Sequence, residues 1–118
     1  FVVMSDAIRL PTAIGEGKER EVQTLLADHW RRLVTITLRN GAFLADHSAR
    51  FPITIQAVLG RGLLRVGERE YVLEPGTIVA VEAHAVHNVL ASPELTLLVT
   101  FFRQPDGGTE QDTSAKFD

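Results

Sequence analysis

The 118-residue chain contains no cysteine and only one tryptophan, one tyrosine and one methionine. Without cysteine it cannot form a disulfide scaffold, a thiol nucleophile or a cysteine-ligated zinc or iron–sulfur site. Long apolar runs are lacking too: none approaches the roughly 20 residues of a transmembrane helix. Basic runs stop at the Arg31-Arg32 pair, and the net charge is −3. We therefore expect neither a nucleic-acid nor a membrane partner.

The composition that is present fits one globular domain. Hydrophobic residues make up 45% of the chain and charged residues 23%, as in soluble domains of this length. The first ten residues, FVVMSDAIRL, have neither the basic start nor the long apolar stretch of a secretory signal. On this basis we expect a cytoplasmic protein.

Short apolar bursts with a period near two run along most of the chain. Asn40-Gly41 and Pro75-Gly76 are strong turn signals between them. Short strands with turns about every 8 to 12 residues indicate an antiparallel sandwich or barrel. The predicted strands cover residues 19–27, 32–38, 53–59, 62–66, 70–73, 77–81, 87–90 and 95–102.

Residues 17–30 are the one stretch that also fits an amphipathic helix. We favour a strand, because Asp28-His29-Trp30 then makes a turn into the next strand. Residues 1–18 are then an N-terminal extension or first edge strand, and residues 19–103 form the barrel. After Arg103 the chain is polar and glycine-containing, which predicts a flexible tail over residues 104–118.

Two histidines, His47 and His87, each follow a glycine that comes shortly before them in the chain. Gly41 is followed by five residues and His47, with Gly60 further on; Gly76 is followed by five residues and a stretch that reaches His87. In these spacings the sequence resembles the small single-domain cupins, whose motifs read G(X)5HXH(X)3,4E(X)6G and G(X)5PXG(X)2H(X)3N. The resemblance spans residues 19–103. It implies an all-β jelly-roll barrel, that is, an antiparallel double-stranded β-helix.

The resemblance also implies a divalent metal (Fe, Mn, Ni, Zn or Cu) held by three histidines and a glutamate. His47 and His87 match two of these ligands. The second histidine position is Ala49, however, and the glutamate position falls on Ile53 or Thr54. The first motif is therefore degenerate, and two ligands alone make a poor metal site.

Two other side chains are candidates to complete the metal site. Gln56 lies on the strand that normally supplies the glutamate, and its Oε1 contributes if Thr54 and Gln56 face the barrel interior. If Ile53 and Ile55 face inward instead, it does not. His84 lies three residues before His87 and joins it only across a turn or bulge.

Further residues are candidates to contact a small-molecule ligand in the barrel, beside His47 and His87. Arg50 directly follows the first motif, and a guanidinium suits a carboxylate or phosphate. Thr54 and Phe43 are the other two candidates.

Three functions stay open. The first is a metal-binding cupin that acts on a small oxygen-rich molecule by oxidation, isomerisation or lyase chemistry. The second is a metal-free module that binds or senses a small ligand. The third is metal-free acid–base catalysis, such as sugar epimerisation, in which His47 is paired with Asp46 or Tyr71; Asp46 is the poorer partner, since adjacent strand residues face opposite ways. The resemblance also implies a homodimer.

Overall fold

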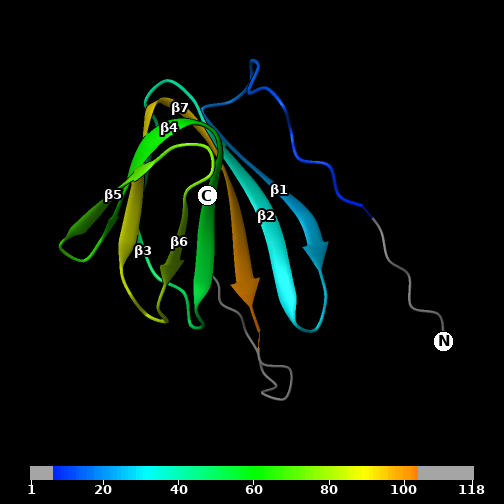
Figure 1. Cartoon of the computed structure of the whole chain (residues 1–118), viewed down its shortest axis with the longest axis vertical. Coiled ribbons are helices and arrows are strands. Elements are labelled where there is room, and N and C mark those ends of the chain that lie inside the picture. Colours follow the sequence, from blue (N-terminus) through cyan, green and yellow to red (C-terminus); the bar gives the residue numbers. More distant parts are fainter. Residues whose placement is uncertain (1–6, 104–118) are drawn as a thin grey trace.

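The computed structural model describes residues 7–103, which form seven antiparallel strands (Figure 1). This confirms the predicted all-β fold, and residues 20–27 form a strand rather than a helix. The predicted tail lies outside the described residues, as do residues 1–6. No helix of the described range is long and apolar enough to cross a membrane. The strands are β1 (Arg20–Ala27), β2 (Arg31–Leu38), β3 (Phe43–His47), β4 (Ile53–Val66), β5 (Arg69–Leu73), β6 (Ile78–Val81) and β7 (His87–Phe102).

The two longest strands, β4 and β7, each contribute to both walls of the barrel. The start of β4 pairs with β6 and with the end of β7, which also pairs with β2 and through it with β1. The end of β4 pairs with β5 and with the start of β7, which also pairs with β3. The prediction of separate strands at 53–59 and 62–66, and at 87–90 and 95–102, was wrong. In each place one strand continues through a bend.

Glycine allows β4 to bend against β7. A Cβ at Gly60 would overlap the backbone carbonyl of Glu94, and a Cβ at Gly62 would lie 2.5 Å from the carbonyl oxygen of Leu90. Gly60 also has a φ of +79°, which favours glycine. The register between β4 and β7 shifts at this point. The close approach of the two backbones therefore fixes where one wall turns into the other.

The two turns predicted from glycine are confirmed. Asn40 and Gly41 have φ values of 58° and 69°, and the amide of Ala42 donates to the Arg39 oxygen at 3.1 Å, which is a tight turn between β2 and β3. The amide of Thr77 donates to the Glu74 oxygen at 2.9 Å around Pro75-Gly76, and Gly76 has a φ of 98°. This is the geometry of a type II turn.

Alternating side chains fill the space between the walls. On β2, Val34, Ile36 and Leu38 are fully buried, and the intervening Thr35 and Thr37 lie on the other face of the strand. The same alternation places Ile53 and Ile55 of β4 in the core. His87 is one of the few polar side chains buried among them.

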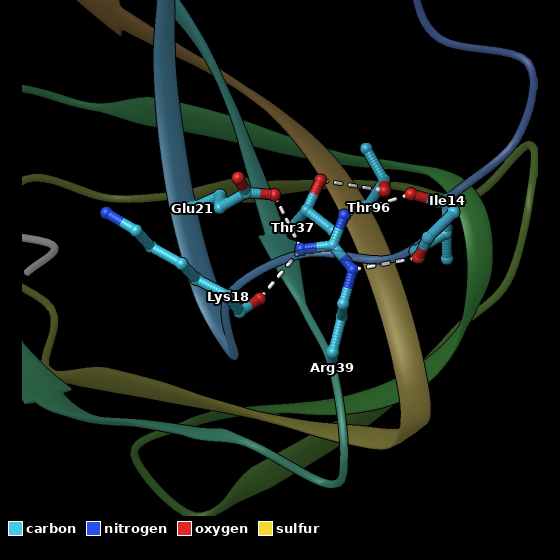
Figure 2. A network of polar contacts seen from close by, with 7 residues as sticks. Ile14, Lys18, Glu21, Thr37, Arg39 and Thr96 are labelled. Carbon is cyan, nitrogen blue, oxygen red and sulfur yellow. Dashed lines mark hydrogen bonds and ion pairs between the residues drawn. The ribbon is translucent and has the colours of Figure 1, made fainter.

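A buried arginine fastens the N-terminal segment to the end of β2 (Figure 2). The Nε of Arg39 donates to the Gly15 oxygen at 2.9 Å, and Nη2 donates to the Ile14 oxygen at 2.9 Å. Its Nη1 donates to the Lys18 oxygen at 2.7 Å and to Glu21 Oε1 at 2.5 Å. Because these partners lie before β1 or at its start, one side chain holds residues 14–21 against the sheet.

Candidate functional site

His47 and His87 meet inside the barrel. His47 ends β3 and His87 begins β7, and the two residues are cross-strand partners. Their ring centroids lie 4.2 Å apart with an interplanar angle of 64°. The pairing of β3 with β7 therefore brings together the two histidines that the motif spacings single out.

The backbone fixes how both rings are turned. Nδ1 of His47 lies 2.7 Å from the Ala45 oxygen, and Nδ1 of His87 lies 3.0 Å from the Ala85 oxygen. A carbonyl oxygen only accepts hydrogen bonds, so each Nδ1 carries the hydrogen and donates it. In the neutral ring Nε2 then carries a lone pair. Both Nε2 atoms are buried, and that of His87 has no hydrogen-bond partner among residues 7–103.

Burial makes His87 a neutral group at pH 7. Its side chain is 1% exposed. Burial lowers the pKa of His87 below its usual 6.5, and the neighbouring His47 lowers it further. The Ala85 carbonyl and the Asp46 carboxylate act in the opposite direction but do not reverse the shift. His87 is therefore a hydrogen-bond acceptor through Nε2 rather than a cation.

The two acid partners considered for His47 have described contacts of their own. Asp46 is exposed, and its Oδ1 accepts a hydrogen bond from Asn88 Nδ2 at 2.7 Å. Asn88 follows the inward-facing His87, so this contact lies on the outer side of the wall. Tyr71 is half-buried on β5 and packs against the hydrophobic core.

Gln56 and Thr54 lie on the outer face of β4. They alternate with Ile53, Ile55 and Ala57, which are all in the core. A strand that turns these residues inward turns its intervening residues outward. Gln56 therefore does not supply the missing glutamate oxygen, and Thr54 does not line the barrel interior.

His84 stands apart from the histidine pair. It is exposed in the turn after β6, with a φ of 68°, and its amide donates to the Ala49 oxygen at 2.7 Å. It occupies the position of the motif glycine, where a left-handed backbone is required. The turn carries its side chain to solvent rather than toward His87.

Phe43 and Arg50 are both exposed. Phe43 is 44% exposed and pairs with the exposed Leu90, so it lies outside the barrel. Arg50 is exposed in the β3–β4 loop, with its Cζ 5.3 Å from the centroid of the Phe51 ring. Arg50 is thus near the barrel end by its place in the chain, and its described contact is to Phe51.

An arginine that was not among the predicted site residues lies on the inner face. Arg32 precedes Val34 at the two-residue spacing of the buried side chains of β2, and its Cζ lies 5.3 Å from the centroid of the Phe101 ring. The signal was available, since Arg32 shares the period of Val34, Ile36 and Leu38. Residues two apart on a strand point to the same face, so an arginine at this spacing from buried residues faces inward with them.

Comparison with solved structures identifies the architecture. An RmlC-like cupin from Shewanella frigidimarina matches with a TM-score of 0.69 and 24% identity, over 79% of this chain and 84% of that one. A cupin superfamily protein from Desulfitobacterium hafniense matches with a TM-score of 0.68 and 14% identity, over 75% and 84%. This chain has the cupin fold.

A third match is a salicylate 1,2-dioxygenase from Pseudaminobacter salicylatoxidans. Its TM-score is 0.68 and its identity 16%, over 75% of this chain and 27% of the dioxygenase. No protein-family model and no curated protein matches the present sequence. At these identities the comparisons establish the fold, and the chemistry has to be argued from the site.

The residues of this cupin-fold chain do not fit the four-ligand metal site that the resemblance implies. Two imidazoles are present, but the positions of the other two ligands carry the buried Ala49 and Ile53 or the outward-facing Thr54. In residues 7–103 no group of three or more histidine and acidic side chains is placed to hold a metal ion. Protein sites for transition metals use about three or four protein ligands.

Proposed function

We propose that this cupin-fold protein binds a small molecule at the His47–His87 pair without a resident metal. The observation that supports this is the orientation of the two rings. Each Nδ1 is committed to a backbone carbonyl, and each Nε2 is turned into the barrel. This arrangement holds hydrogen-bond acceptors ready in an apolar interior, which is how small-ligand sites fix the orientation of a ligand.

The buried Nε2 of His87 defines what the ligand offers. A buried polar atom without a partner costs about 1–3 kcal/mol. A hydroxyl or N–H group that donates to this atom recovers that free energy. The ligand is therefore a small molecule with at least one hydrogen-bond donor, placed among aliphatic side chains such as Val89 and Leu64.

A divalent metal on the pair is the competing function. The ring orientation favours it, because metal-binding histidines also donate their second ring nitrogen to a carbonyl or carboxylate. The donor set opposes it, since Ala49 and Ile53 offer no ligand atom. We rank small-molecule binding first because the pair alone supplies the hydrogen-bond acceptors that it needs, whereas a metal ion needs further ligands.

The experiment is a ligand screen read out on the histidine rings. The ring Cε1–H signals of His47 and His87 are followed by NMR while small hydroxylated and amide-bearing compounds are added. The proposal predicts compounds that move both signals together and leave those of His29 and His84, both exposed, in place. Replacing either His47 or His87 with glutamine should weaken the binding of the same compound by about tenfold, which corresponds to the loss of one hydrogen bond.

Other results contradict the proposal. A compound that binds without moving the signal of either ring, or that binds both glutamine variants as tightly as the unmodified protein, places the site elsewhere. Stoichiometric binding of Zn²⁺ or Ni²⁺ that requires both rings favours the metal function instead. His29→Gln and His84→Gln are the matched controls for loss of an imidazole.

A further inference from the structure

Arg32 is placed on the inner face of the barrel at the start of β2. It pairs with Phe101 of β7, which in turn pairs with Ile53 of β4. Directly paired residues of an antiparallel sheet project from the same face, and both Phe101 and Ile53 are buried. Because the guanidinium carbon lies 5.3 Å from the Phe101 ring centroid, the charged group stands over this inner face.

No carboxylate neutralises Arg32 within residues 7–103. The salt bridges of that range use other arginines: Arg31, Arg39, Arg61 and Arg65. Arg31, the adjacent residue, projects from the other face and pairs with Asp28 at 3.2 Å. Arg32 is half-buried, and its one described contact is the Phe101 ring. It is therefore an inward-facing cation with five N–H donors to offer.

Arg32 and the histidine pair lie at the same end of the barrel. β7 starts at His87 in one wall, bends at the other end and finishes at Phe102 in the facing wall. Figure 1 shows the first residues of β7 and its arrowhead at the same end of the molecule. The imidazoles thus belong to one wall and the guanidinium to the other. Packed sheet walls are about 10 Å apart, a distance that a small organic molecule spans.

We propose that Arg32 makes this site selective for an organic anion, with a carboxylate on its guanidinium and a hydroxyl or N–H group of the same molecule donating to Nε2 of His87. The inference rests on the proposed function of the pair and adds the class of ligand. Guanidinium binds a carboxylate through two parallel hydrogen bonds. A neutral His87 supplies an acceptor and no charge, so the positive charge comes from Arg32. Small hydroxy acids and acylamino acids have the required groups.

A purely structural role for Arg32 makes a different prediction. If the guanidinium only covers Phe101, its replacement changes stability and leaves ligand preference as it was. The test therefore compares each acid with its uncharged amide, so that size and hydroxyl group stay matched. The probes are glycolate with glycolamide and 4-hydroxybenzoate with 4-hydroxybenzamide, titrated while the His47 and His87 ring signals are followed.

The expected result is a preference of about tenfold or more for the acid in the unmodified protein. In Arg32→Met the preference should fall below about twofold, and Arg32→Lys should keep part of it, since lysine retains the charge but not the planar fork. Arg31→Met is the matched control and should keep the full preference, because Arg31 is on the outer face with Asp28. Thermal melting of each variant reports its folding.

Each remaining outcome overturns a defined part of the account. If acids and amides shift the NMR signals of the histidine rings at equal concentrations, the proposed selectivity for anions is wrong, but the proposed ligand site at the histidine pair stands. If Arg32→Met and Arg32→Lys both keep the full acid preference, the selectivity resides in another residue. If no probe moves the ring of either histidine, the proposed function fails and the inference fails with it.

Discussion

Nδ1 of His87 lies 3.0 Å from the backbone oxygen of Ala85, two residues earlier in the chain. His47 repeats this relationship with the oxygen of Ala45 at 2.7 Å. Both contacts are made between a side chain and the backbone of its own strand or turn. The orientation of each imidazole is therefore set locally, before any ligand contributes.

The first prediction concerns the tautomers of the two rings. Because a carbonyl oxygen only accepts, we expect His47 and His87 both to carry the hydrogen on Nδ1 in their neutral forms, the form less common in water. Long-range ¹H–¹⁵N NMR spectra distinguish the two ring nitrogens and check this directly. The exposed His29 serves as the control in the same spectrum. A hydrogen on Nε2 of His87 would contradict the acceptor role that we give that atom.

The second prediction concerns stability and pH. Burial holds the folded-state pKa of His87 below 6.5, so between those two pKa values the unfolded chain binds a proton that the folded chain does not. The free energy of unfolding is therefore at its full value above about pH 6.5 and falls as the pH drops toward the folded-state pKa, with a slope of at most about 1.4 kcal/mol per pH unit. Urea unfolding at several pH values measures this.

His87→Gln is the matched variant for the pH experiment. It keeps a polar side chain at this position but removes the titrating group, so the slope below pH 6.5 should become smaller. The neighbouring titratable groups, His47 and Asp46, are still present in the variant. An identical slope in both proteins would show that His87 does not cause the dependence.

The third prediction compares two glycines with similar backbone angles. Gly60 and Gly67 have φ values of 79° and 60°, but a Cβ at Gly67 meets no atom within 4 Å. Gly67→Ala should cost about 1–2 kcal/mol of unfolding free energy, the price of the left-handed backbone. Gly60→Ala should cost at least about 2 kcal/mol more, because the Glu94 carbonyl lies where the Cβ would be. Equal losses in denaturant unfolding would show that the bend tolerates a side chain.

The fourth prediction concerns Arg39. Arg39→Met should lower the free energy of unfolding by about 2–4 kcal/mol, since the buried guanidinium makes four hydrogen bonds, one of them to the Glu21 carboxylate. Arg61→Met is the control, because the Arg61–Glu74 ion pair is exposed and should contribute less than about 1 kcal/mol. Hydrogen exchange should also increase in residues 14–21 of the Arg39 variant. A loss no larger than that of the control would show that this network contributes little.

Local chemistry made much of the fold predictable. Asn40-Gly41 and Pro75-Gly76 mark their turns because few other residue pairs adopt those backbone angles. The alternation of apolar residues in β2 predicted which face of the strand is buried. The continuous strands β4 and β7 were not predicted, because the bend at Gly60 depends on Glu94, a residue far away in the sequence. The Gly-Arg-Gly sequence of residues 60–62 looks like a strand end when the partner strand is unknown.

The candidate site was predictable only in part. His47 and His87 were found because their spacings to Gly41 and Gly76 are local. Which face Gln56 takes depends on a one-residue register that the sequence of β4 leaves open, and the structure turns it outward. The homodimer and the cytoplasmic location stay predictions.

The central claim is that the His47–His87 pair serves as a ligand site and not as a metal centre. Its most direct test is the metal content of protein purified without a histidine tag or chelator, then offered one equivalent of Zn²⁺, Ni²⁺, Fe²⁺, Mn²⁺ or Cu²⁺ and dialysed. The account predicts far less than one equivalent retained, and a gain in Ala49→His, which adds a third imidazole at a buried position. Near-stoichiometric metal in the unmodified protein that is lost in His47→Ala would contradict the claim.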